Sequence, residues 1–139
     1  HAGADRRTIA RMSDHIHGHA VLDDIAPLGR ALRHAIPDVY QGYVALSAAA
    51  MKPGAVDVKT KELIAIGIAI SLRCDGCIAA HARAASKAGA SREEVAEAIG
   101  VAMMLNGGPG TVYGPRAFDA FCEFADARDA KAAEAAGTA

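Results

Sequence analysis

Apolar residues recur along most of this chain at the three- and four-residue spacing that a helix presents on one face. This pattern predicts helices over residues 13–34, 37–51, 57–73, 77–87, 91–105 and 113–128. No segment shows the strict alternation of a half-buried strand. The sequence therefore predicts an all-α bundle of about six helices. The helix over 57–73 is apolar nearly all round, so we expect it at the centre.

Capping and helix-breaking residues mark the ends of these helices. Asp57 is a favourable N-cap residue, and Ser91 with Glu94 forms a capping box. Gly89 is placed to cap the end of the preceding helix. We expect Pro27 to break or kink the first helix, because proline lacks the N–H donor and its ring collides with the preceding turn.

The length of 139 residues suits one domain, and no linker or internal repeat divides the chain. Residues 13–128 are predicted to form this domain. The polar segment 1–12 and the alanine-rich segment 129–139 are predicted to be flexible ends.

Composition points to self-association. Hydrophobic residues make up 52% of the chain, but aromatic residues make up only 4% and tryptophan is absent. Much of the apolar content is alanine, which forms helices well but fills a core poorly. We therefore expect a homo-oligomer, whose interfaces would bury the remaining apolar faces.

The charge pattern argues against nucleic-acid and membrane partners. The formal net charge is -1, and no long run of one sign occurs. The apolar run over residues 63–72 is shorter than the roughly 20 residues that a membrane-spanning helix needs. No signal-peptide pattern is present, so we predict a cytoplasmic protein. In a reducing cytoplasm, a close cysteine pair is more often catalytic or metal-binding than structural.

Two cysteines and a histidine share one predicted helical face. Cys74 and Cys77 lie three residues apart near the start of a helix, which would place their Cα atoms roughly 5–6 Å apart. His81 follows Cys77 by one turn. A helix N-terminus and a nearby imidazole both favour a thiolate, the nucleophilic form of cysteine. We predict Cys77 as the attacking thiol, because it is nearer His81, and Cys74 as its disulfide partner.

Glu62 is the candidate partner of His81. If the two helices form an antiparallel hairpin that turns near Arg73, Glu62 lies about one helical turn from His81 along the axis. A side chain or one water can span that distance. The predicted order of action is Glu62 to His81 to Cys77.

The spacing Glu62-x11-Cys74-x2-Cys77-x3-His81, within KELIAIGIAISLRCDGCIAAHARAASKAGASREEVAEAI, resembles the AhpD-like alkylhydroperoxidase family. This family lies in the carboxymuconolactone decarboxylase-like superfamily. The resemblance covers roughly residues 40 to 125. It implies an all-α fold in which a central antiparallel helix pair carries the CxxC motif. It also implies a homo-oligomer, and the single copy of the core unit favours a hexamer over a trimer.

The resemblance further implies reduction of organic hydroperoxides or peroxide. The second cysteine, Cys77, would form a sulfenate that Cys74 resolves to a disulfide, with Glu62 and His81 as the proton relay. A dithiol, such as a lipoyl carrier protein, would restore the thiols, and no cofactor is implied. One departure is Gly76, which stands where well-studied relatives carry a second histidine and so removes one relay group.

Two other functions stay open. One is a decarboxylase or lactone-acting enzyme on the same fold, which would not need a CxxC motif. The other is a non-enzymatic redox sensor or zinc-binding oligomer. Cys74, Cys77 and His81 supply only three of the four ligands of a structural zinc site. Cys122 lies among apolar residues and is predicted to be a core cysteine rather than the fourth ligand.

Several polar residues outside this motif have simpler expected roles. His15 and His19 share a predicted helical face with His17 between them, but we expect exposed polar residues there rather than a metal site. Asn106 either caps the end of its helix or lines a pocket. Residues 107–110, Gly-Gly-Pro-Gly, are predicted to form a loop and not a phosphate-binding loop, because no strand precedes them.

Overall fold

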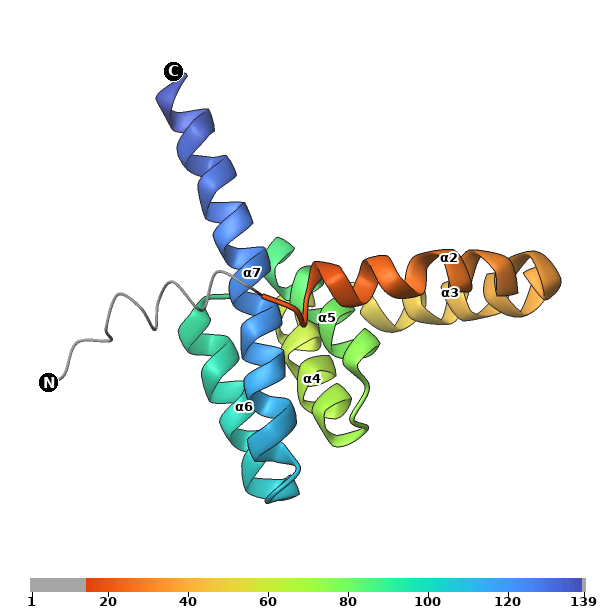
Figure 1. The fold of residues 1–139 in the computed structure, drawn as a ribbon, viewed down its shortest axis with the longest axis horizontal. Coiled ribbons are helices and arrows are strands. Elements are labelled where there is room, and N and C mark those ends of the chain that lie inside the picture. Colours follow the sequence, from red (N-terminus) through yellow and green to blue (C-terminus); the bar gives the residue numbers. More distant parts are fainter. Residues whose placement is uncertain (1–14, 139) are drawn as a thin grey trace, which may run out of the picture.

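The structure, a computed structural model, describes residues 15–138 (Figure 1). These residues contain helices and no strand, which confirms the all-α prediction. In chain order, the helices are α2 (His19–Ala35), α3 (Pro37–Met51), α4 (Val58–Ser71), α5 (Asp75–Lys87), α6 (Arg92–Asn106) and α7 (Gly110–Gly137).

Helices α4 to α7 form the body of the molecule and enclose its core. Small alanines let these helices approach closely, and a few larger side chains fill the centre, among them Ile66, Ile70, Ile78, Val95 and Phe121. As predicted, α4 and α5 form an antiparallel pair, since α5 begins only a few residues after α4 ends. The expected central position of α4 is only partly confirmed, because its outer residues Ile64 and Ile68 remain exposed.

Helices α2 and α3 form a hairpin that projects from the body, which we call the arm (Figure 1). Neither helix has a buried residue. The break expected at Pro27 does not occur, because α2 continues through this residue. Pro27 and Asp23 are exposed, so water can hydrate the Asp23 carbonyl that loses its partner at the proline.

The predicted caps are confirmed. Asp57 accepts the backbone N–H of Thr60 at 2.7 Å, and Ser91 with Glu94 forms the complete capping box. Gly89 has φ +85° and follows Ala88, the C-cap residue of α5, as expected of a glycine that ends a helix in the left-handed conformation.

The last helix is longer than predicted at both ends. It begins at Gly110 rather than near Tyr113, and it extends to Gly137 rather than ending near Arg128. The high helix propensity of alanine explains the C-terminal extension, because the described residues beyond Arg128 are all exposed. The flexibility predicted for 129–139 stays a prediction, and the predicted flexible segment 1–12 lies outside the described residues. No helix of the described residues is long and apolar enough to cross a membrane.

Candidate active site

A tight reversal between α4 and α5 positions the cysteines. Arg73 has φ 53°, a left-handed conformation, and its N–H donates to the Ile70 carbonyl at 3.1 Å. The Cys74 N–H donates to the Ala69 carbonyl at 3.1 Å, which completes a Schellman motif. Cys74 is at the same time the N-cap residue of α5. One helix therefore ends and the next begins within a few residues, and the CxxC motif lies at the N-terminus of α5.

Cys74 and Cys77 form a disulfide in this structure, with their Cα atoms 5.2 Å apart. This confirms the proximity predicted from their spacing. The Cys74 sulfur also accepts the Cys77 backbone N–H at 3.2 Å, so it occupies the position of a capping oxygen. Both residues are partly exposed, and Cys77 also packs against the hydrophobic core. The pair is therefore anchored on one side and open to solvent on the other.

Glu62 and His81 meet directly, as predicted. The Glu62 carboxylate lies 2.7 Å from Nδ1 of His81. The Glu62 side chain is only 8% exposed, whereas that of His81 is 36% exposed. Because a buried carboxylate is costly without a partner, this hydrogen bond fixes the imidazole ring. Nδ1 is thereby engaged, and Nε2 is the ring nitrogen left for proton exchange.

Cys77 and His81 occupy positions i and i+4 of α5, which lie next to each other on a helix surface. The buried carboxylate, the imidazole and the Cys77 thiol thus follow one another across α4 and α5. Such an arrangement can accept a proton from a thiol and return it to a leaving group.

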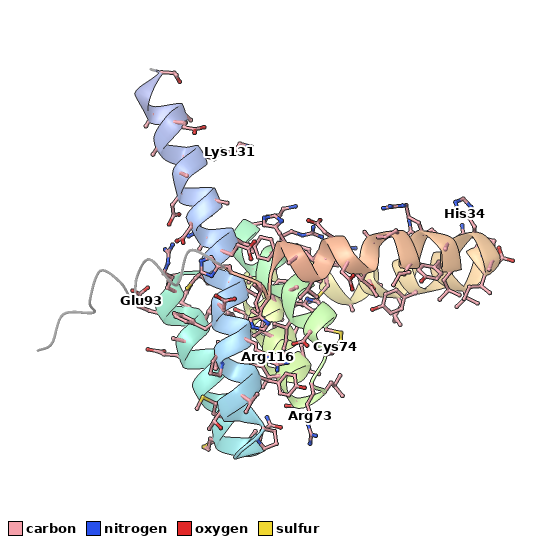
Figure 2. The ribbon with its side chains drawn as sticks, in the orientation of Figure 1. His34, Arg73, Cys74, Glu93, Arg116 and Lys131 are labelled. Atoms are coloured by element: carbon pink, nitrogen blue, oxygen red, sulfur yellow. A yellow bond between two sulfur atoms is a disulfide. The ribbon has the colours of Figure 1, made fainter. Side chains whose placement is uncertain are left out.

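Sequence spacing missed one contact of this site. Arg116 on α7 reaches Asp75, the residue between Cys74 and Gly76, with Nη1 at 3.2 and 3.4 Å from the two carboxylate oxygens. Its guanidinium also lies 4.7 Å from the centre of the Tyr113 ring. Figure 2 shows Arg116 in the same part of the body as Cys74. Forty-one positions separate the two ionic partners, so no local pattern could have indicated the pair.

The remaining cysteine belongs to the core. Cys122 is buried and free, as predicted, and burial raises the pKa of its thiol. In the part of the chain that the structure describes, no three histidine, cysteine or acidic side chains cluster in a way that could hold a metal ion. Cys122 therefore does not complete a ligand set with Cys74, Cys77 and His81.

The N-terminal histidines differ from the prediction. His15 and His19 do not share a helical face, because α2 begins only at His19. His15 instead pairs through Nδ1 with Asp119 of α7. His19 donates its backbone N–H to Glu123, and its ring packs edge-on against Phe124 with centroids 4.6 Å apart. These contacts attach the start of α2 to α7.

Asn106 ties two helix ends together. Its side-chain amide donates to the Ala102 carbonyl at 2.7 Å and to the Ser71 hydroxyl at 2.9 Å. These bonds link the last turn of α6 to the last residue of α4, a role different from the two left open for Asn106. Residues 107–109 form the predicted turn, in which Gly107 has φ +64°.

The sequence is similar to those of several known proteins. The sequence model of the carboxymuconolactone decarboxylase family matches residues 37–120. An uncharacterised protein of Haemophilus influenzae is 48% identical over 85 residues, which are 61% of this chain and 75% of that protein. An uncharacterised protein of Cupriavidus necator is 33% identical over 91 residues, 66% of this chain and 80% of that protein.

Solved structures show the same fold. A carboxymuconolactone decarboxylase family protein of Legionella pneumophila superposes with a TM-score of 0.74 at 40% identity, covering 76% of this chain and 95% of that one. A family protein of Thermotoga maritima superposes with a TM-score of 0.69 at 28% identity, covering 81% and 95%.

Proposed function

This chain belongs to the carboxymuconolactone decarboxylase family, and we propose that it is a thiol-dependent peroxidase of the AhpD-like type. One observation carries the proposal. The Glu62–His81 hydrogen bond lies on the helix pair that carries the Cys74–Cys77 disulfide. A role in the antioxidative response has been suggested for the Thermotoga maritima relative, which is in keeping with this chemistry.

The reaction begins at Cys77. His81 accepts the thiol proton, and the thiolate attacks the O–O bond of the hydroperoxide. The sulfur becomes a sulfenic acid, and the alkoxide that leaves takes a proton from His81 to give an alcohol. The Cys74 thiol then attacks the sulfenic sulfur, which releases water and forms the disulfide. Two electrons have passed from the thiols to the peroxide.

Glu62 acts on this sequence through His81. A carboxylate on Nδ1 keeps the ring oriented and stabilises the imidazolium that forms when the thiol is deprotonated. A dithiol reductant, for which the lipoyl group of a carrier protein is the proposed source, attacks the disulfide and restores both thiols by exchange. A reducing cytoplasm would suit this cycle, and the cytoplasmic location stays a prediction.

The test is hydroperoxide consumption with dihydrolipoamide as the electron donor, using cumene hydroperoxide and hydrogen peroxide as oxidants. We expect Cys77→Ser to abolish turnover and Cys74→Ser to accumulate a sulfenic acid on Cys77 that dimedone traps. Cys122→Ser is the matched control and should retain turnover, because Cys122 is buried and forms no disulfide.

Three outcomes would overturn the proposal. Full turnover in Cys77→Ser would reject the mechanism. A decarboxylase or lactone activity that survives loss of both Cys74 and Cys77 would favour the other enzymatic branch. A stoichiometric zinc ion in protein purified without chelator, combined with no turnover, would favour a non-enzymatic oligomer.

We also propose that the working form is a homo-oligomer, with a hexamer favoured over a trimer. The arm exposes many large apolar side chains: Ile25, Leu28, Leu32, Val39, Tyr43, Val44 and Leu46. A second apolar surface is a groove of about 520 Å³ between α4 and α6. It is lined mainly by Leu63, Ile64, Ile68, Leu72, Val101 and Leu105. Apolar patches of this extent are typical of protein interfaces.

A further inference from the structure

Asp75 is an unusual neighbour for a reactive cysteine. It occupies the first position of α5, directly after Cys74 and two residues before Cys77. A carboxylate there interacts favourably with the helix dipole. It also opposes the formation of a second negative charge, the thiolate, on a sulfur of the same turn. Asp75 alone would therefore make both thiols harder to deprotonate.

Arg116 supplies the opposite charge from another helix. Its Nη1 lies 3.2 Å from one Asp75 oxygen and 3.4 Å from the other. The Tyr113 ring, one helical turn earlier on α7, lies 4.7 Å from the guanidinium carbon and helps to hold it in place. The two side chains are 35% and 42% exposed, so solvent screens the pair only in part.

The other charged groups around the cysteines do not replace Arg116. Glu62 on α4 is paired with His81 on α5, which leaves little net charge from that couple when the imidazole is protonated. Arg73 is exposed at the turn. Among the described residues, Arg116–Asp75 is the one ion pair that involves a residue of the segment 73–77. No ion pair of the described residues joins α2 to α5.

We propose that Arg116 is a positioning residue that offsets the charge of Asp75, so that the N-terminus of α5 remains favourable for a thiolate at Cys74 or Cys77. The inference rests on the proposed function only in that the thiolate is the reactive form. The residue acts through Asp75 and does not contact the sulfurs.

Thiol titration tests this role without any peroxidase assay. Reduced Cys74→Ser and Cys77→Ser proteins each leave one site thiol, whose pKa is read from the pH dependence of thiolate absorbance at 240 nm and of iodoacetamide alkylation. In each background, Arg116→Gln should raise the thiol pKa by about 0.5, a Coulomb effect across one helical turn near the surface. Asp75→Asn should lower it by a similar amount.

The double variant Asp75→Asn, Arg116→Gln should return the thiol pKa close to its starting value, because both charges are gone. Arg83→Gln is the matched control, since it removes one positive charge from an exposed position further along α5. Arg116→Lys keeps the charge and should behave nearly as the parent protein. If Arg116→Gln fails to fold, the thiol pKa should still fall in Asp75→Asn and stay near the parent value in Arg116→Lys.

The inference is overturned if Arg116→Gln shifts the thiol pKa no more than Arg83→Gln does, or if Asp75→Asn leaves it unchanged. A change in thermal stability alone, with an unmoved thiol pKa, would show a merely structural ion pair. These results are independent of turnover. A protein with shifted thiol pKa values but no peroxidase activity would refute the proposed function and retain the role of Arg116.

Discussion

Glu62 is the residue on which the site depends most, because it is a carboxylate buried beside isoleucines in a helix of the core. An unpaired charge at such a depth would be strongly destabilising. Its hydrogen bond to His81 satisfies the carboxylate and at the same time orients the imidazole. One contact therefore serves both folding and the proposed chemistry.

Replacing Glu62 by glutamine tests this dual role. Gln keeps the shape and a hydrogen-bonding oxygen, so we expect the fold to persist, as judged by circular dichroism. The loss of charge should lower kcat/KM for cumene hydroperoxide by about 100-fold, the lower range for a proton-transfer group. Glu97→Gln, an exposed carboxylate on α6, is the control and should change neither quantity. Wild-type turnover in Glu62→Gln would remove Glu62 from the mechanism.

Arg73 is strained where it stands. Its left-handed backbone conformation ends α4, a position that favours glycine, and the equivalent position after α5 is Gly89. Arg73→Gly should raise the free energy of unfolding of the oxidised protein by about 1 kcal/mol, because the left-handed conformation costs a non-glycine residue about that amount. The expected rise in Tm is about 3 °C for a domain of this size.

Gly89→Ala provides the reverse experiment and should lower the free energy of unfolding by about 1 kcal/mol. Both values can be measured by urea denaturation under oxidising conditions. An Arg73→Gly protein less stable than the wild type would mean that the arginine side chain contributes more than its backbone conformation costs.

At the scale of elements, the start of α6 is held by a charged network. Glu94 closes the capping box with Ser91 and also accepts a hydrogen bond from Lys59 of α4 at 2.7 Å. The Lys59 ammonium, and then the Ser91 backbone N–H, hold the pKa of the Glu94 carboxyl below its ordinary value of 4.5. The cap therefore links two helices as well as starting one.

This network predicts a pH dependence of stability. Because the pKa of Glu94 is lower in the folded protein, its contribution is fully present above pH 4.5 and is lost as the pH falls through the folded-state pKa. Glu94→Gln retains a capping-box side chain but loses the charge. It should lower Tm at pH 7, and the difference from the wild type should shrink at pH 3.

Glu93→Gln is the control for this experiment, since Glu93 is an exposed acid in the same first turn of α6. Its smaller effect on Tm measures the helix-dipole contribution alone. If the Tm difference between Glu94→Gln and the wild type stays constant from pH 7 to pH 3, the stabilisation by Glu94 is not electrostatic.

At the scale of the whole molecule, contacts within a single chain do not explain what stabilises the arm. Its two helices have no buried residue and expose apolar side chains along their length. Most helical stability in proteins comes from burying an apolar face. The proposed homo-oligomer would supply that burial.

A charge placed on the arm tests this assembly. Leu28 on α2 is 61% exposed in the single chain, and Leu28→Glu should lower the molar mass measured by light scattering by at least half, because an interface cannot bury an unpaired carboxylate. Gln41→Glu, at an exposed polar position of α3, should retain the wild-type mass. An unchanged mass in Leu28→Glu would exclude this face from the interface.

Local patterns in the sequence determined the helical class, the caps at Asp57 and Ser91, and the meeting of Glu62 with His81. The helical class depends on periodicity, and the caps depend on side chains that accept hydrogen bonds from N–H groups three residues on. The Glu62–His81 contact also depends on a hairpin whose short turn allows little variation. Local reasoning failed where solvent or propensity decided the outcome. Pro27 and Asp23 are exposed, so water can hydrate the carbonyl that lacks a partner and α2 continues, and alanine extends α7 beyond the core.

Only the tertiary structure decided which residue of a distant helix approaches the cysteines. Arg116 reaches Asp75 because α7 crosses the N-terminus of α5, and His15 pairs with Asp119 because the start of α2 lies on the same helix. Such contacts join residues far apart in the chain, whose relative positions depend on how the helices pack. Periodicity shows which face of a helix is apolar, but not which neighbour will cover it.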